Sequence, residues 1–282
     1  MNGEAEQPVN GEAERPVTEI QHLLTEKVGH TLVCTFNRPE AKNAFTPNML
    51  SRMLEAWETA DADDDIRVVI LTGGPDVFCA GADLKAMFAA PDPGDDYAKR
   101  YSEDAGLAWK ALLRHYRLTK PLIAAVEGPA IAGGTEILQA TDIRVAGVGA
   151  TFGVAEVRRG LFPLGGSTVR LRRQIPYTLA AEMLLTGKTI TAEQALEYGL
   201  VGHVVPKGEA LKKAHEIADL IAANGPLAVK AVLRSLKETE GLPEDEALKI
   251  ELEIGMHVFA TNDAKEGPRA FAEKRKPNFT GT

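Results

Sequence analysis

Two glutamates that lie twenty residues apart occur in stretches whose composition suits acid–base chemistry. Glu136 ends the segment Gly128-Pro-Ala-Ile-Ala-Gly-Gly-Thr-Glu, and Glu156 follows Phe152-Gly-Val-Ala. The pair Gly133-Gly134 comes where an apolar, strand-like stretch gives way to a helix-like one. Glycines at such a turn let the backbone approach a ligand, and they leave free N–H groups at the positive end of a helix. Two carboxylates near these donors could move protons at a carbon beside a polarised carbonyl.

Each of these features also has a purely structural explanation. A lone glutamate in a helix usually lies on a solvated face, and a glycine pair can simply permit close packing of a helix on a strand. The carboxylate three residues after Gly133 favours the site interpretation. Glu127 and Asp142 are interpreted as structural, and Asp83 as a residue that caps or orients its loop.

Composition sets wide bounds on function. The length of 282 residues fits one large domain or one domain with an appendage, and the net charge of −8 argues against a large nucleic-acid footprint. No apolar run is long enough to span a membrane, so no membrane partner is expected. Two cysteines without a signal-peptide pattern fit a reducing cytoplasm.

The six histidines show no metal-binding spacing, so no metal site is expected. Gly165-Gly166-Ser167 lacks the last glycine of a nucleophile elbow, and Gly147-Val-Gly149 lacks the third glycine of a dinucleotide-binding loop. The sequence therefore implies no bound cofactor.

The chain divides into three regions. Residues 2–9 and 10–17 repeat an acidic, Gly- and Pro-containing unit with a single change, which predicts a disordered tail over 1–18. From 19 to 205, strand-like and helix-like patterns alternate, which predicts an α/β core with parallel pairings. From 206 to 282 the pattern is wholly helical and predicts a lid or an oligomer interface.

The individual elements follow from hydrophobic periodicity and from turn residues. We expect a helix over 47–57 with Thr46 as its N-cap and Pro47 at its first position. The expected strands are 31–36, 68–72, 122–126 and 143–146, and the expected C-terminal helices are 209–222, 226–238, 244–259 and 264–273.

Several motifs occur in an order that resembles a known family. They are Phe78-Cys-Ala-Gly-Ala-Asp-Leu-Lys85, the segment 125–136, Phe152-Gly-Val-Ala-Glu156, the segments 185–195 and 199–201, and Glu273-Lys-Arg-Lys-Pro-Asn-Phe279. In this order the chain resembles the crotonase (enoyl-CoA hydratase/isomerase) superfamily, and most of all its actinobacterial-type hydratases. The resemblance implies a crotonase-like spiral of ββα turns over 19–205 with an acyl-CoA site. It also implies that 206–282 is a helical trimerisation region and that the protein is a homotrimer or homohexamer.

The resemblance also implies roles for individual residues. Glu136 and Glu156 match the family's catalytic acids, and the backbone N–H groups of Ala82 and Gly133 match its oxyanion hole. Its CoA-binding positions are matched by Ala41, Lys85, Phe271 and Lys274, of which the last two reach a neighbouring subunit's CoA. Its acyl pocket or water site is matched by Leu164 and Gly165. The CoA belongs to the substrate and is not a separate cofactor.

The resulting hypothesis is an enoyl-CoA hydratase of fatty-acid or sterol side-chain β-oxidation, because both glutamates are present. One alternative is a Δ3-Δ2-enoyl-CoA isomerase, which could use a single carboxylate. The other is a non-catalytic acyl-CoA-binding scaffold, which would need neither. Leu164 follows Pro163 where many short-chain hydratases have a small residue, so it could reshape the acyl pocket.

Overall fold

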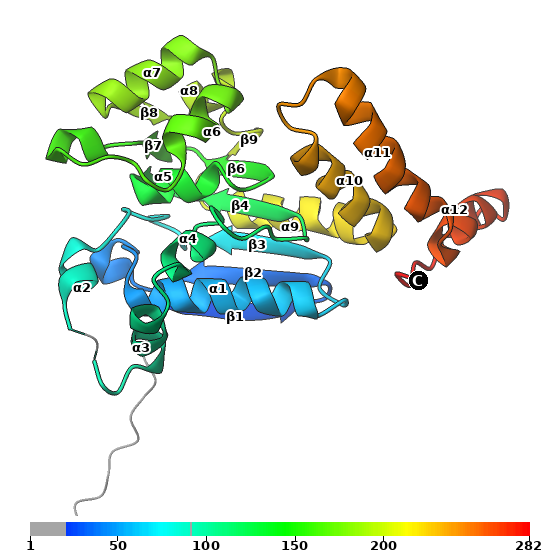
Figure 1. Ribbon diagram of the computed structural model, residues 1–282, viewed down its shortest axis with the longest axis horizontal. Helices are drawn as coiled ribbons and strands as arrows, with labels where there is room; N and C mark the ends of the chain where they lie inside the picture. The colour runs from blue at the N-terminus through cyan, green and yellow to red at the C-terminus, as the bar shows by residue number, and fades with distance from the viewer. Residues whose placement is uncertain (1–20, 91) are drawn as a thin grey trace, which may run out of the picture.

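The computed structural model describes residues 21–90 and 92–282, and the tail predicted over 1–18 lies outside them. A six-stranded sheet forms the centre of the molecule (Figure 1). Its order is β1 (Leu23–Val28), β2 (Thr31–Phe36), β3 (Val68–Thr72), β4 (Leu122–Val126), β6 (Ile143–Gly147) and β9 (His203–Val205). β1 and β2 form an antiparallel hairpin, and the following neighbours pair in parallel. The four predicted strands are thereby confirmed.

A second, three-stranded sheet contains β5 (Pro129–Ile131), β7 (Thr151–Gly153) and β8 (Thr189–Thr191). The chain passes from β4 in the large sheet to β5 in the small one, then through α5 (Gly133–Leu138) to β6 and β7. The β4–β5–α5 turn thus places one strand in each sheet and a helix at the corner between them. A bridge between Cys79 and Ala130 extends the small sheet into the preceding turn.

The remaining helices of the core surround the two sheets, and α1 is the longest of them. They are η1 (Pro39–Ala41), α1 (Pro47–Ala62), α2 (Leu84–Phe88), α3 (Asp96–Glu103), α4 (Leu107–Ala111), η2 (Glu156–Arg159), α6 (Ser167–Gln174), α7 (Tyr177–Thr186) and α8 (Ala192–Glu197). α1 begins as predicted, because the Thr46 side chain accepts a hydrogen bond from the Met49 N–H at 3.1 Å. Its fully buried Trp57 donates Nε1–H to the Ala111 carbonyl at 2.9 Å and so joins α1 to α4.

Helix α9 (Ala210–Ala222) lies on the large sheet. An alanine at every fourth position gives it a face without large side chains, so its backbone packs closely on β3, β4 and β6. The Glu127 carboxylate fixes its start, since one oxygen accepts hydrogen bonds from the Gly208 and Ala210 N–H groups at 3.0 Å. These contacts agree with the structural interpretation of Glu127.

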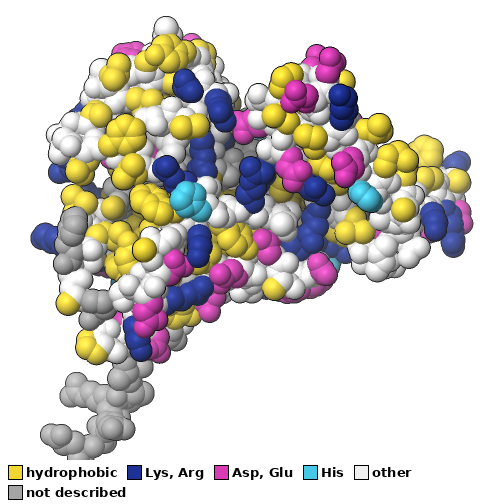
Figure 2. All heavy atoms as spheres, viewed as in Figure 1, with side chains coloured by type: hydrophobic (Ala, Val, Ile, Leu, Met, Phe, Trp, Pro, Cys, Tyr) yellow, Lys and Arg dark blue, Asp and Glu magenta, His cyan; other side chains and the backbone are white. Residues whose placement is uncertain are grey.

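The last three helices extend from the core as an arm, which we define as α10 (Pro226–Glu238), α11 (Glu244–Phe259) and α12 (Asn262–Ala272) (Figure 1). Hydrophobic side chains are visible on its surface (Figure 2). Five of them are between 59% and 75% exposed: Val232, Leu236, Leu252, Met256 and Phe259. Such a surface is typical of a contact face between subunits. No helix of the described residues is long and apolar enough to cross a membrane.

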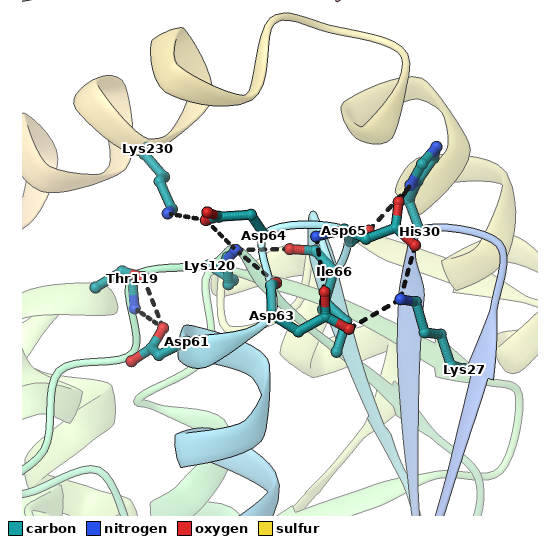
Figure 3. A network of polar contacts seen from close by, with 10 residues as sticks. All are labelled: Lys27, His30, Asp61, Asp63, Asp64, Asp65, Ile66, Thr119, Lys120 and Lys230. Carbon is teal, nitrogen blue, oxygen red and sulfur yellow. Dashed lines mark hydrogen bonds and ion pairs between the residues drawn. The ribbon is translucent and has the colours of Figure 1, made fainter. Parts of the chain in front are cut away.

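Ion pairs attach the arm to the core, and Figure 3 shows the one between Lys230 and Asp64. Lys230 of α10 meets Asp64 of the loop after α1 at 3.4 Å. Lys237 meets Asp142 at 3.3 Å, in agreement with the structural interpretation of that aspartate. Beneath Asp64 the buried Lys120 donates to the Ile66 carbonyl at 2.7 Å, and burial lowers the pKa of its ammonium.

Candidate active site

The turn that leads into α5 explains both glycines of the pair. Ala132 has φ +53°, and Gly133 is the first residue of the helix. A Cβ on Gly134 would lie 2.2 Å from the Cys79 carbonyl oxygen, so only glycine lets α5 approach the segment at Cys79 so closely. The helix carries Glu136 inward, where it is 4% exposed.

Two backbone N–H groups hold the Glu136 carboxylate. Gly165 donates to Oε2 at 2.9 Å, and Ser167 donates to Oε1 at 3.1 Å. A Cβ on Gly165 would lie 2.5 Å from Oε2, so this position requires glycine. Gly165 was predicted as part of the acyl pocket or water site, and the structure shows its N–H in direct contact with the Glu136 carboxylate. The part played by Ser167 was missed, although a Gly-Gly-Ser segment signals a loop with free N–H groups.

Glu156 begins the short helix η2 and is in a different environment. Its Oε2 is buried and has no hydrogen-bond partner among residues 21–90 and 92–282. Burial, and after it the negative charge of Glu136, together raise the pKa of Glu156 from 4.5 to about 7. The structure therefore brings the two predicted acids into one electrostatic unit.

The two predicted N–H donors also lie on adjacent loops. A Cβ on Gly81, the residue before Ala82, would be 3.1 Å from the Gly133 nitrogen. Within the described part of the chain, neither the Ala82 nor the Gly133 N–H donates to a backbone carbonyl of another segment. Both groups are thus available to an acceptor.

Phe45 holds these loops together and was missed in the sequence. Its N–H donates to the Gly81 carbonyl at 2.8 Å, and its carbonyl accepts from the Asp83 N–H at 2.9 Å. The two bonds flank Ala82 on either side. The Phe45 ring lies against Gly133, where an added Cβ would be 3.1 Å from it. No sequence signal marks this residue, because its role depends on backbone bonds to a distant loop.

An ion pair between Arg38 and Asp83 joins the two segments that carry the predicted CoA positions Ala41 and Lys85. Arg38 contacts the Asp83 carboxylate at 3.1 Å and donates to the Ala44 carbonyl at 3.0 Å. Asp83 caps α2, as predicted, by accepting from the Lys85 and Ala86 N–H groups at 3.1 Å. The Ala86 N–H and then Arg38 lower the pKa of Asp83. The side chain of Lys85 is exposed, while its backbone is therefore held in place by the Asp83 cap.

Leu164 and the two C-terminal residues lie farther out. Leu164 is 51% exposed, and its carbonyl accepts a hydrogen bond from Arg114. Phe271 belongs to α12 and Lys274 follows it, whereas Glu136 belongs to α5, and Figure 1 shows these helices at opposite ends of the molecule. Within one chain, Phe271 and Lys274 do not join the site.

A cavity of about 560 Å³ lies where the arm meets the core. Lys and Arg side chains gather at this junction in Figure 2, and Arg117, Lys230 and Lys237 are among the lining residues. The cavity contains neither Glu136 nor Glu156, so the site assignment rests on the carboxylate pair. No group of three or more potential metal ligands occurs among the described residues.

A spiral of paired strands with corner helices, two inward-facing glutamates and two free N–H groups defines an α/β protein with the crotonase fold. The family model for enoyl-CoA hydratase/isomerase matches residues 26–282. The chain belongs to the enoyl-CoA hydratase/isomerase family, and the predicted fold and family are confirmed.

Individual relatives agree with this family. The chain is 61% identical over 256 residues to enoyl-CoA hydratase EchA19 of Mycobacterium tuberculosis, covering 91% of this chain and 95% of that one. It is 37% identical to a short-chain-enoyl-CoA hydratase of Clostridium acetobutylicum, with coverage of 92% and 98%. The crystal structure of an enoyl-CoA hydratase from Mycobacterium tuberculosis superposes with a TM-score of 0.84 at 43% identity, covering 93% of this chain and 100% of that one.

Gly165→Ala tests the close backbone contact that holds the Glu136 carboxylate. The added methyl group must displace the carboxylate, so we expect kcat for enoyl-CoA hydration to fall by roughly 10²-fold while the fold is retained. Gly255→Ala is the control, because a Cβ there meets nothing within 4 Å. Steady-state kinetics and circular dichroism provide the measurements. Wild-type turnover by a folded Gly165→Ala protein would contradict the role given to this contact.

Proposed function

We propose that the protein is an enoyl-CoA hydratase that adds water reversibly to a trans-2-enoyl-CoA and gives a 3-hydroxyacyl-CoA. The observation that carries the proposal is the pair Glu136 and Glu156, two inward carboxyl groups in unlike surroundings. The first accepts two backbone N–H bonds, and the second is desolvated with a pKa of about 7. Hydration needs one group that takes a proton and one that gives a proton, and this difference supplies both.

In the forward reaction Glu136 accepts a proton from water. Its oxygens keep lone pairs for this purpose beyond the two N–H bonds. The water oxygen forms a bond to Cβ, and the electron pair of the double bond moves towards the thioester carbonyl. Glu156, neutral below its raised pKa, then gives its proton to Cα. A proton passing from Glu136 to Glu156 restores the starting state.

The developing charge on the thioester oxygen is assigned to the N–H groups of Ala82 and Gly133. Their loops lie side by side and both groups are free of intersegment bonds, which supports this assignment. Loss of one such donor typically costs about 3 kcal/mol of transition-state stabilisation. Phe45 maintains the arrangement, since its backbone bonds flank Ala82.

The isomerase and the scaffold alternatives fit less well. Moving a proton between Cα and Cγ can use one carboxylate, and a binding scaffold needs none. Here the second glutamate carries an energetic cost, because its carboxyl group is desolvated and its Oε2 lacks a hydrogen-bond partner within the described chain. Such a group is typical of a catalytic acid.

The rest of the substrate would extend from this pair in two directions. Ala41 and Lys85 are assigned to CoA on the same chain, and Phe271 and Lys274 to the CoA of a neighbour in a homotrimer or homohexamer. On the acyl side, Leu161, Phe162 and Leu164 are 47% to 62% exposed and form an apolar rim. This rim favours a bulky acyl group, as in fatty-acid or sterol side-chain β-oxidation. The buried free thiols of Cys34 and Cys79 agree with a cytoplasmic location.

Glu136→Gln and Glu156→Gln test the two assignments. Each should lower kcat by ~10²–10⁴-fold with little change in acyl-CoA affinity, because each removes one proton-transfer group. The double variant should lose far less than the product of the two factors, since the acids act as a unit. Near-wild-type hydration by either single variant would overturn the proposal.

The pH profile of the same proteins distinguishes the two roles. Glu156 must be protonated to act, and its pKa is about 7, so forward hydration by the wild type should decline as the pH rises above 7. Glu156→Gln cannot lose a proton there, so its residual rate should lack this decline. If Glu156→Gln still loses activity above pH 7, the titration of another group causes the decline.

Assembly and the shared site are tested together. The exposed apolar surface of the arm predicts a trimer or hexamer by light scattering. Lys274→Ala should weaken CoA-thioester binding without changing the oligomeric state. An isolated exposed lysine interacts weakly through water, so a residue outside the site would give almost no effect. A fully active monomer, with Lys274→Ala equal to wild type, would refute the shared site.

A further inference from the structure

The chain reverses direction after α12 and runs back along that helix. We call residues 275–282 the return segment. Its N–H groups bind side chains of α12: Asn278 donates to Glu266 at 2.9 Å, and Thr280 donates to Asp263 at 2.8 Å. At its end the Thr282 carbonyl accepts from the Asn262 N–H at 2.6 Å. The segment is therefore bound along the whole helix.

Lys274 lies at the reversal itself. Its φ of +54° is in the left-handed region of backbone conformation, which residues other than glycine rarely adopt. Lys274 donates to the Phe271 carbonyl at 3.2 Å, and Arg275 donates to the Ala270 carbonyl at 3.0 Å, so the turn closes α12 tightly. A lysine in this conformation needs contacts elsewhere that maintain it.

Arg275 supplies those contacts. Its guanidinium binds both carboxylate oxygens of Glu266, at 2.5 and 2.9 Å, and contacts Glu273 at 2.6 Å. Arg275 and the Asn278 N–H lower the pKa of Glu266 to about 2. Glu266 thus binds the return segment at the residue directly after Lys274 and again three residues later.

The other end of the segment is fixed to the core. Asp263 is 6% exposed, and its second oxygen accepts from the Gly281 N–H at 2.9 Å. Arg67, at the start of β3, donates to the Phe279 carbonyl at 3.1 Å and to the Ala222 carbonyl at 2.8 Å. The backbone of the return segment, which begins directly after Lys274, is therefore fixed to the core as well as to the arm.

We infer that Glu266, Arg275 and Asp263 are positioning residues for Lys274: the return segment holds its backbone in the left-handed turn so that the ammonium reaches a phosphate of a neighbouring copy's acyl-CoA. The inference rests on the proposed function and on the shared site. Its effect is on binding, because only the fraction of molecules with Lys274 correctly placed makes the contact.

Electrostatics alone predicts the opposite change in CoA affinity when Glu266 is removed. Glu266 is a negative charge near a cation that would meet phosphate, so its removal should strengthen CoA binding by charge. A positioning role predicts weaker binding. The sign of the change in affinity therefore separates the two explanations.

The experiment measures acetyl-CoA binding by calorimetry, which does not require turnover, together with steady-state hydration. Glu266→Ala should raise the dissociation constant and KM by roughly three- to tenfold and leave kcat within about twofold. Arg275→Lys, which keeps the charge, should change them less than Arg275→Ala. Glu251→Ala removes an exposed glutamate of α11 and is the matched control with no expected effect. Light scattering checks that the oligomer is intact.

The decisive comparison repeats Glu266→Ala in a Lys274→Ala background. If the glutamate acts through the lysine, its removal then has no further effect on binding. An equal loss in both backgrounds, or tighter binding in Glu266→Ala, overturns the inference. A Lys274→Ala protein that binds like wild type overturns it together with the shared site, whereas the hydratase proposal is judged separately by the kcat of the Glu136 and Glu156 variants.

Discussion

The site depends on the two hydrogen bonds from Gly165 and Ser167 to the Glu136 carboxylate. They fix a charged group in the interior, where it would be unfavourable without donors. They also fix the loop that carries Leu164, because Gly165 can approach only without a side chain. The carboxylate fixed here then raises the pKa of Glu156, after the larger effect of burial, so the pair becomes unequal. The proton-transfer chemistry follows from that inequality.

The spiral fold brings these groups together from separate turns. Strand β4 leads through β5 to α5 and Glu136, and β7 in the next turn leads to Glu156. The glycine pair lets α5 pack against the segment at Cys79, which sets the depth of Glu136. Phe45, which follows β2, bonds to both residues that flank Ala82 and touches Gly133. The turns that follow β2, β3, β4 and β7 thus all contribute to the site, and the parallel register of β3, β4 and β6 aligns them.

Much of this could be predicted from the sequence. Strand and helix positions followed from apolar periodicity and from Thr46 and Pro47, and the motif order indicated the family and both glutamates. The partners of Glu136 could not be predicted, because they are backbone groups 29 and 31 residues away that no side chain identifies. Phe45 was missed for the same reason. The helical pattern begins near residue 206, but the alanine face of α9 lies on the sheet, and the arm starts at Pro226.

Hydration of trans-2-hexenoyl-CoA by the purified protein in H₂¹⁸O tests the central claim, that a pair of unlike carboxyl groups adds water across the double bond. The account predicts loss of enoyl-thioester absorbance and a 3-hydroxyacyl-CoA that carries one ¹⁸O at C3 by mass spectrometry. It also predicts that the double variant with Glu136→Gln and Glu156→Gln slows this incorporation by at least ~10²-fold while acyl-CoA remains bound. Migration of the double bond without ¹⁸O, or undiminished incorporation in the double variant, would contradict it.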